Sequence, residues 1–152
     1  MSDHVPPNRH AGAVGRDDLG FLLAKATQRW NELLAERFAE AGFADVRAAY
    51  GSVLVPLFEE DGLRIGELGR RARLSKQAMT EMIRRLERDG LVERRPDSQD
   101  GRASLIFLTA RSRAFQPVAE RVLGELGGLA QAKLGAERVE QVRRALSSLS
   151  DL

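Results

Sequence analysis

One stretch of the chain, residues 74–108, constrains the possible fold more than any other. In residues 75–89, apolar side chains recur at steps of three and four among basic and hydroxyl side chains, and Gly90 follows. This spacing predicts an amphipathic helix that ends at the glycine. Directly after it, two short apolar runs flank a polar turn at residues 97–102, which is the pattern of a β-hairpin. The stretch therefore predicts a helix followed at once by a hairpin.

A shorter helix is expected just before this stretch, at residues 65–72, with a tight connection at Arg73 and Leu74. Ser75 is the N-cap expected for the helix that follows. Two helices joined by a tight turn form a helix-turn-helix pattern, and the hairpin would add a wing. The outward face of the second helix is basic and polar, with Lys76, Gln77, Thr80, Glu81, Arg84, Arg85 and Arg88. A helix with such a face fits the major groove of DNA.

Positive charge is concentrated in the same region. Between Asp61 and Phe115 the chain has 13 Lys or Arg against 8 Asp or Glu, whereas the remainder has 11 against 14. This segregation of charge favours a polyanionic partner such as double-stranded DNA. It is a stronger indication of such a partner than the small net charge of +2.

Several kinds of active site are excluded by the residues that the sequence lacks. The chain has no cysteine and only two histidines, His4 and His10. Disulfides, thiolate nucleophiles and Cys-bound zinc are therefore excluded, and no Ser-His-Asp triad or His-rich metal site is expected in the core. The sequence also has no phosphate-binding glycine loop and no convergent general acid and base. We expect no enzymatic activity, no metal and no cofactor.

The rest of the sequence predicts one domain with helices on both sides of the helix-turn-helix. Residues 1–15 are expected to form a flexible leader, and residues 16–152 a single domain. The further helices are predicted from Asp17 or Asp18 to Gly42, from about Asp45 to Glu59, from Thr109 to about Gly127 or Gly128, and from Glu137 to Leu149. No apolar run approaches the roughly 18 residues of a membrane span. We expect a cytoplasmic protein without a membrane partner.

The order of these elements and the sequence around the hairpin resemble the MarR family of winged helix-turn-helix transcriptional regulators. The matching segments are residues 65–69, 74–80, 83–94 and 100–103, followed by Leu108 and Thr109. The resemblance implies a mainly α fold with a small β-hairpin wing. In such a fold, residues 61–108 would form the winged helix-turn-helix DNA-binding lobe, and residues 16–60 and 109–152 would form the dimerisation helices.

The function that the resemblance implies is that of a homodimer, most often a repressor, that binds a pseudo-palindromic operator. In many members a small anionic or phenolic effector enters between the dimer base and the DNA-binding lobe. The alternative is a winged-helix module that binds another protein and does not bind DNA. Arginines on both the second helix and the hairpin tip favour DNA, because a protein-binding wing would not need both sets.

Three groups of DNA-contacting residues are expected. The major-groove group comprises Ser75, Lys76, Gln77, Thr80 and Arg84. Within it, Gln77 suits adenine and Lys76 suits guanine. The backbone group would bind phosphates without sequence choice and comprises Arg73, Arg85, Arg88, Arg94 and Arg95. For the wing, the resemblance implies that Arg102 enters the minor groove and that Asp100 holds this arginine extended.

Several charged residues have alternative partners within the chain. These partners are Arg84 or Arg85 for Glu81, Glu67 for one or two of Arg70, Arg71 and Arg73, and Asp97 or Asp100 for Arg94 and Arg95. Pairing is preferred for Glu81. Phosphate contact is preferred for Arg94, and Arg70 and Arg71 remain further phosphate candidates.

Two aromatic residues raise the question of an effector site. Trp30 and Tyr50 lie on the apolar stripes of the first two predicted helices, and the family's pocket lies between those helices and the fifth. Core packing is the preferred interpretation of both aromatic residues, and pocket lining is the alternative. Solvated charges are the preferred interpretation of Arg16, Arg47 and Arg113, and neutralisation of an anionic effector is the alternative. The expectation of a pocket depends on the resemblance alone.

Overall fold

The computed structural model describes residues 15–152, so nearly all of the predicted leader, with His4 and His10, lies outside the described residues. The elements are α1 (Leu19–Glu40), the 3-10 turn η1 (Ala48–Tyr50), α2 (Gly51–Glu59), β1 (Leu63–Arg64), α3 (Ile65–Ala72), α4 (Lys76–Arg88), β2 (Val92–Pro96), β3 (Ser104–Leu108), α5 (Ala110–Leu134) and α6 (Ala136–Leu149). The predicted fold, mainly α with a small hairpin wing, is confirmed.

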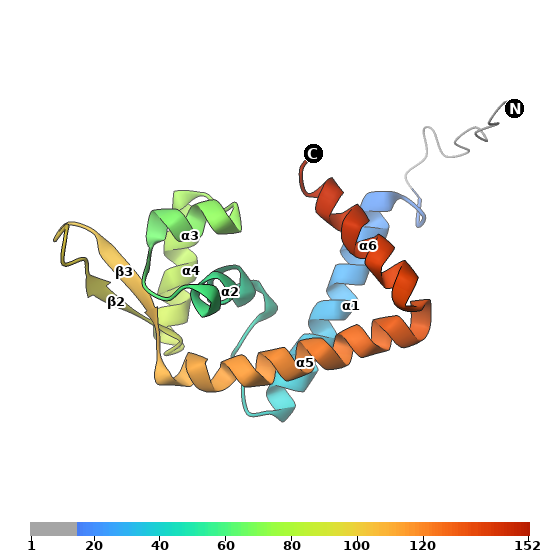
Figure 1. Cartoon of the computed structure of the whole chain (residues 1–152), viewed down its shortest axis with the longest axis horizontal. Helices are drawn as coiled ribbons and strands as arrows, with labels where there is room; N and C mark the ends of the chain where they lie inside the picture. The colour runs from blue at the N-terminus through green and yellow to red at the C-terminus, as the bar shows by residue number, and fades with distance from the viewer. Residues whose placement is uncertain (1–14) are drawn as a thin grey trace, which may run out of the picture.

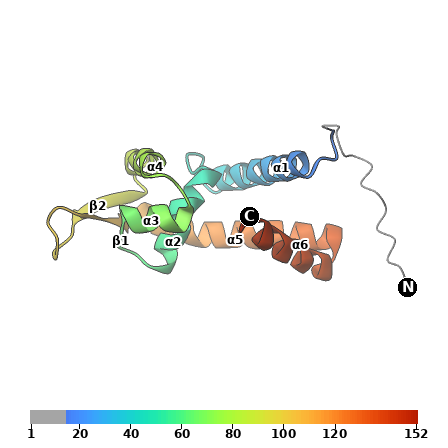
Figure 2. The ribbon, with the colours of Figure 1, turned by 90° about the horizontal axis from the view of Figure 1, so that it is seen from above.

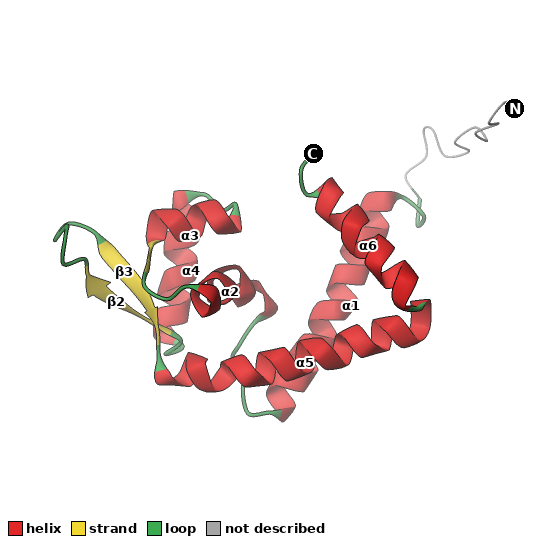
Figure 3. Ribbon diagram, in the orientation of Figure 1, coloured by secondary structure: helices red, strands yellow, loops and turns green. Residues whose placement is uncertain are grey.

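The elements form two parts. In Figure 1, α2, α3, α4 and the sheet form a lobe at one end, α1 and α6 lie at the other, and α5 runs from one to the other. Figure 3 shows that the strands are confined to the lobe. Seen from above in Figure 2, α1, α5 and α6 all extend away from the lobe. Helix α1, from the start of the described chain, thus lies outside the lobe together with α5 and α6, from its end.

Side-chain caps start three of the helices where the sequence predicts them. Asp18 accepts a hydrogen bond from the Phe21 backbone N–H (3.1 Å) at the start of α1, and Ser75 accepts one from Ala78 (3.1 Å) at the start of α4. Thr109 begins α5 with a capping box. Each cap satisfies a backbone N–H that has no partner within its own helix. The predicted caps are confirmed.

The predicted start of the second helix is wrong. Helical geometry begins at Ala48, as the 3-10 turn η1, and passes into α2 at Gly51, whereas the sequence predicted a start near Asp45. Arg47 is extended, with φ −89° and ψ 148°. The carboxylate of Asp45 is bound by both terminal nitrogens of Arg111 on α5, which holds this segment away from helical geometry.

The predicted end of the fifth helix is also wrong. Helix α5 continues through Gly127 and Gly128 to Leu134, and it ends at Gly135, whose φ is 86°. A glycine inside a helix costs only about 1 kcal/mol relative to alanine. Contacts of α5 with α1 and α6 offset that cost.

The three strands form one antiparallel sheet in the order β1-β3-β2. Strand β3 pairs Ile106 with Leu63 of β1, and it runs beside β2 from Leu108 opposite Val92 to Ser104 opposite Pro96. Pro96 lies on an edge strand, where the missing backbone N–H leaves no neighbour unpaired. The turn between β2 and β3 extends beyond the sheet as the wing.

An apolar core fills the lobe and continues along α5. Tyr50 is 1% exposed, so core packing is confirmed for this residue. Phe38 of α1 meets Phe115 of α5 edge to face, with ring centroids 4.8 Å apart, a geometry that aromatic pairs favour. Core packing was also preferred for Trp30, but its exposed fraction of 37% places it outside the core of this chain.

Candidate nucleic-acid interface

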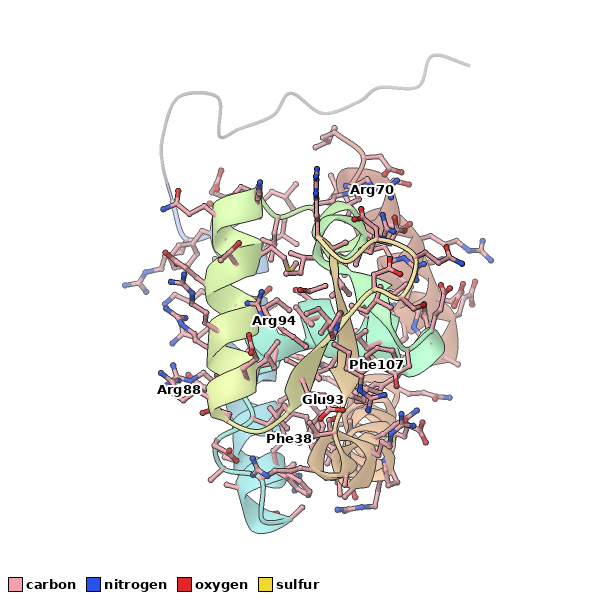
Figure 4. The ribbon with its side chains drawn as sticks, turned by 90° about the vertical axis from the view of Figure 1, so that its left-hand side faces the viewer. Phe38, Arg70, Arg88, Glu93, Arg94 and Phe107 are labelled. Carbon is pink, nitrogen blue, oxygen red and sulfur yellow. The ribbon has the colours of Figure 1, made fainter. Side chains whose placement is uncertain are left out.

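The packing of α4 decides which of its side chains face outward. Met79, Ile83 and Leu86 are fully buried against the lobe, and burial of each contributes roughly 2 kcal/mol. These residues lie three and four positions apart, so they share one face of the helix. The opposite face points away from the lobe, as Figure 4 shows for Arg88. Its exposed residues are Lys76, Gln77, Glu81, Arg84, Arg85 and Arg88, with Ser75 at the cap.

Two residues of α4 differ from expectation. Thr80 is half-buried, and its hydroxyl donates to the Lys76 carbonyl at 2.8 Å. The hydroxyl oxygen can therefore still accept a hydrogen bond, but its proton is engaged within the helix. The preferred pairing of Glu81 is wrong, because within residues 15–152 neither Arg84 nor Arg85 forms an ion pair with it.

Arg94 and Arg95, at the base of the hairpin, are paired within the lobe. Arg94 Nε lies 2.7 Å from Glu87 of α4, and Figure 4 shows Arg94 between α4 and the hairpin. Arg95 Nε lies 2.9 Å from Glu93, and its guanidinium lies over the ring of Phe107 at 4.4 Å. The wing aspartates that the sequence offered as partners bind neither arginine. These ion pairs are partly exposed, so each can exchange its carboxylate for a phosphate at small cost.

The arginines of α3 also have carboxylate partners. Arg70 is ion-paired with Glu67, and Arg71 binds both Glu67 (3.0 Å) and Glu60 (2.8 Å). The expectation that Glu67 pairs with one or two of the arginines at positions 70, 71 and 73 is confirmed for Arg70 and Arg71. Arg88 lies 3.4 Å from Asp89. In contrast, four cations of α4 and the wing have no ion pair or hydrogen-bond partner for their side chains within residues 15–152: Lys76, Arg84, Arg85 and Arg102.

The wing turn is held by two aspartates in different ways. Asp97 is buried, accepts the Gln99 backbone N–H at 2.9 Å, and lies 2.6 Å from Arg64. The Gln99 N–H and, after it, the Arg64 guanidinium hold the pKa of Asp97 below its usual range. Sequence reasoning missed Arg64, which follows Leu63 on β1 and carries no motif of its own. Its bond to Asp97 ties the wing to the sheet edge.

Asp100 contacts Arg102 through the backbone. Its carboxylate accepts the Arg102 backbone N–H at 3.1 Å, whereas the Arg102 guanidinium is exposed and makes no bond to it. Asp100 therefore fixes the turn from which Arg102 projects and leaves the arginine side chain itself unrestrained.

Arg73, in the turn between α3 and α4, is bound by the segment after α6. Its guanidinium donates to the Ser150 carbonyl and lies 3.1 Å from the Asp151 carboxylate. This cation was expected at a DNA phosphate, and in the isolated chain a carboxylate occupies that position.

A cavity of about 140 Å³ lies between α1, the η1–α2 segment and α5. Its lining is almost wholly apolar and comprises Leu34, Phe38, Val46, Arg47, Ala48, Gly51, Leu54, Val55, Phe58, Phe115, Ala119 and Leu123. Of the four residues expected at an effector pocket, only Arg47 lines it. Tyr50 is buried and Trp30 is partly exposed, and neither is part of the lining. Arg113 binds Asp61 at 2.6 Å. The apolar lining residues resemble ordinary core positions in the sequence, so no sequence signal marked them.

The described part of the chain offers neither a metal site nor a membrane-spanning helix. Among residues 15–152, no group of His, Cys, Asp or Glu is arranged to hold a metal ion. None of the helices between residues 15 and 152 is both long and apolar enough to cross a membrane.

Known proteins resemble this chain in both sequence and structure. The model of the MarR family matches residues 49–104, which include the helix-turn-helix and most of the wing. The transcriptional repressor Rv2887 of Mycobacterium tuberculosis is 36% identical over 93 residues, or 61% of this chain and 67% of that protein. The regulator TtmR of Methylorubrum extorquens is 35% identical over 57% of this chain, but the match spans only 44% of TtmR.

The likeness extends to the whole fold. A probable transcriptional regulator from Pseudomonas aeruginosa superposes with a TM-score of 0.74 at 28% identity, covering 88% of this chain and 97% of the other. These proteins are transcriptional regulators and not enzymes, in agreement with the expectation from the sequence. The chain belongs to the MarR family of winged helix-turn-helix transcriptional regulators.

Proposed function

We propose that this chain is a homodimeric, sequence-specific DNA-binding repressor that a small anionic or phenolic molecule releases from its operator. One observation carries the DNA-binding part of the proposal. On the surface formed by α4 and the wing, the cations without a partner among the described residues are Lys76, Arg84, Arg85 and Arg102. Every other arginine there has a carboxylate partner. Unneutralised cations on one surface attract a polyanion.

The position of each residue supports a division of roles. Ser75, Lys76 and Gln77 lie at the N-terminal end of α4, where a recognition helix meets base edges. Arg84 and Arg85 lie two turns further on, with Arg84 assigned to the groove and Arg85 to phosphates. Arg102 projects from the exposed wing turn toward the minor groove. Arg73, Arg88, Arg94 and Arg95 would bind phosphates after exchanging their present partners.

Apolar side chains left exposed on the helices outside the lobe support a homodimer. They comprise Leu19, Phe21, Leu22 and Trp30 of α1, Leu129 and Leu134 of α5, and Val142 and Leu146 of α6. Helix α6 has no buried residue at all. Exposed apolar residues clustered on three adjacent helices mark an interface, and a two-fold symmetric second copy would cover the same patch on both subunits.

The apolar cavity with Arg47 at its edge supports the effector part of the proposal. A volume of about 140 Å³ suits a molecule with one aromatic ring, and the Arg47 guanidinium, which has no bond within residues 15–152, suits a carboxylate or phenolate. Benzoate and benzyl alcohol separate the contribution of the apolar cavity from that of Arg47, because both molecules carry an aromatic ring and only benzoate carries a negative charge. Stronger release of DNA by benzoate, lost in Arg47→Ala, is the expected result.

DNA binding is tested with a duplex that the wild-type protein selects from a random-sequence pool. Fluorescence anisotropy should give a dissociation constant that Arg102→Ala raises roughly tenfold, since a groove contact contributes about 1–3 kcal/mol. Arg143→Ala on α6 is the matched control, because Arg143 has no partner within residues 15–152 and lies far from the wing. A wild-type protein that enriches no sequence at low salt contradicts the proposal. Equal losses in both variants contradict the wing contact.

Repression is tested separately from binding. A reporter gene placed behind the selected duplex should be transcribed less when the wild-type protein is present and should recover with Arg102→Ala. Increased transcription with the wild type would instead identify an activator.

A further inference from the structure

The C-terminal end of α4 is tied to two other elements by side-chain hydrogen bonds. Tyr50 of η1 donates its hydroxyl to the Asp89 carboxylate at 2.6 Å. Arg111 of α5 donates to the Asp89 carbonyl at 2.9 Å, and the Thr109 hydroxyl donates to the Gly90 carbonyl at 2.7 Å. Asp89 and Gly90 directly follow α4. These bonds therefore fix the position of the C-terminal end of α4 relative to η1 and α5.

The bond from Tyr50 is strong and directional. The side chain is almost wholly buried, and its acceptor is a carboxylate, which makes the hydrogen bond charge-assisted. Burial, and after it the bond to Asp89, raise the pKa of Tyr50 above its ordinary value of 10.0, and the hydroxyl is the donor in this bond. A small movement of η1 must therefore either carry Asp89 with it or break the bond.

The same segment that carries Tyr50 forms a wall of the apolar cavity. Val46, Arg47, Ala48 and Gly51 all line that cavity, and they lie within four residues of Tyr50 on both sides. The segment is anchored at its start by the two bonds, each 2.6 Å, between Asp45 and Arg111. Its residues thus face the cavity on one side and hold α4 on the other.

We infer that Tyr50 is a positioning residue for DNA reading, whose hydroxyl transmits the position of the cavity wall to the recognition helix α4. The inference rests on the proposed function and assigns the regulation of that site. Helix α4 is 13 residues long, so a rigid rod of roughly 20 Å connects Asp89 to the N-terminal turn that reads bases. A molecule that displaces the wall moves this rod through the Tyr50–Asp89 bond.

Tyr50→Phe tests the inference, because it removes one oxygen atom and leaves the buried ring in place. The dissociation constant is measured for the duplex selected by the wild type and for a random duplex of equal length. We expect binding of the selected duplex to weaken about fivefold, the lower end of measured couplings between sites, and binding of the random duplex to stay unchanged. A merely destabilised protein would lose affinity for both duplexes equally.

A double-mutant cycle identifies the partner. Asp89→Ala alone also releases Arg88, but Tyr50→Phe combined with Asp89→Ala should weaken specific binding no more than Asp89→Ala does, since both changes break one bond. Additive losses would overturn the inference, and so would a Tyr50→Phe protein that binds the selected duplex as the wild type does. Failure of the proposed function has a different signature, because the wild type would then select no duplex.

The link to the cavity is tested with benzoate as the probe. Benzoate should weaken DNA binding by the wild type more than by Tyr50→Phe, because the variant lacks the bond through which the wall acts. Equal weakening of both proteins by benzoate would overturn the link.

Discussion

The guanidinium of Arg73 lies 3.1 Å from the carboxylate of Asp151, which joins the turn before the recognition helix to the segment after α6. Arg73 has a left-handed backbone conformation, with φ 53°, which costs a non-glycine residue roughly 1–2 kcal/mol. Both side chains are exposed, so the ion pair contributes about 1 kcal/mol at most to stability. Its larger consequence concerns DNA, because it neutralises a cation that is proposed to bind a phosphate.

Asp151→Asn is expected to strengthen DNA binding. The substitution removes the charge that neutralises Arg73, although the Ser150 carbonyl still accepts a hydrogen bond from this arginine. With one more unneutralised cation on the DNA-facing surface, the dissociation constant for the selected duplex should fall about threefold at low salt. Fluorescence anisotropy at two salt concentrations measures both the affinity and its salt dependence. Glu137→Gln on α6 is the matched control, since it removes the same charge and Glu137 has no bonded partner within residues 15–152. Equal strengthening in both variants would mean that net charge alone is responsible.

Gln77→Ala and Arg85→Ala should weaken DNA binding in different ways. Gln77 is proposed to read a base, so its loss should weaken binding to the selected duplex by roughly tenfold and relax the sequence preference at one position. Arg85 is proposed to bind a phosphate, so its loss should weaken binding to every duplex and reduce the salt slope by about 1. Binding to a panel of duplexes that differ at single base pairs separates the two effects. A uniform loss with Gln77→Ala would rule out base reading by this residue.

Local sequence patterns were sufficient to predict the helix-turn-helix and the wing. The caps at Ser75 and Thr109 and the burial of Met79 and Ile83 follow from helical spacing and capping chemistry, which act within a few residues. Where partners lie far apart in the chain, prediction failed. The start of α2 depends on the contact of Asp45 with Arg111, 66 residues away, and no local pattern records it.

The residue types of the candidate site could be predicted from the sequence, but the partners of its charged side chains could not. The basic face of α4 was evident from the sequence, whereas the partners of its arginines were not. Asp100 was expected to hold the Arg102 side chain and instead binds its backbone N–H. Arg94 pairs with Glu87 on the preceding helix, and the carboxylates nearer in the hairpin are bound elsewhere. These choices depend on the twist of the hairpin and its approach to α4, which side-chain types do not specify.

Leu146→Glu is expected to break the proposed dimer. Leu146 is 44% exposed on α6, and a two-fold axis would place the new charge at the interface twice. Losing the burial of two leucines, at roughly 2 kcal/mol each, should raise the dimer dissociation constant by at least a hundredfold. Sedimentation velocity at micromolar concentration measures the change.

The control for this change is Val55→Glu, which introduces the same group at an apolar residue that is 49% exposed on α2 of the lobe. This variant should remain dimeric. A wild-type protein that sediments as a monomer, or a Leu146→Glu protein that dimerises as well as the wild type, would contradict the proposed interface.

Asp97→Asn is expected to destabilise the wing in a pH-dependent manner. The pKa of Asp97 is lowered from its ordinary value of 3.8 in the folded protein, first by the Gln99 N–H and then by Arg64. A lowered pKa means that the folded state favours the carboxylate. The stability that it contributes is therefore fully present above about pH 4 and is lost as the pH falls through the folded pKa. The free energies of unfolding of wild type and variant should differ at pH 7 and converge below pH 4.

Denaturant unfolding at a fixed protein concentration measures both free energies. The control is Glu59→Gln, because Glu59 is an exposed carboxylate without a bonded partner within residues 15–152. A difference that persisted undiminished at pH 3 would show that the Asn side chain disturbs the turn by its shape and not by its lost charge.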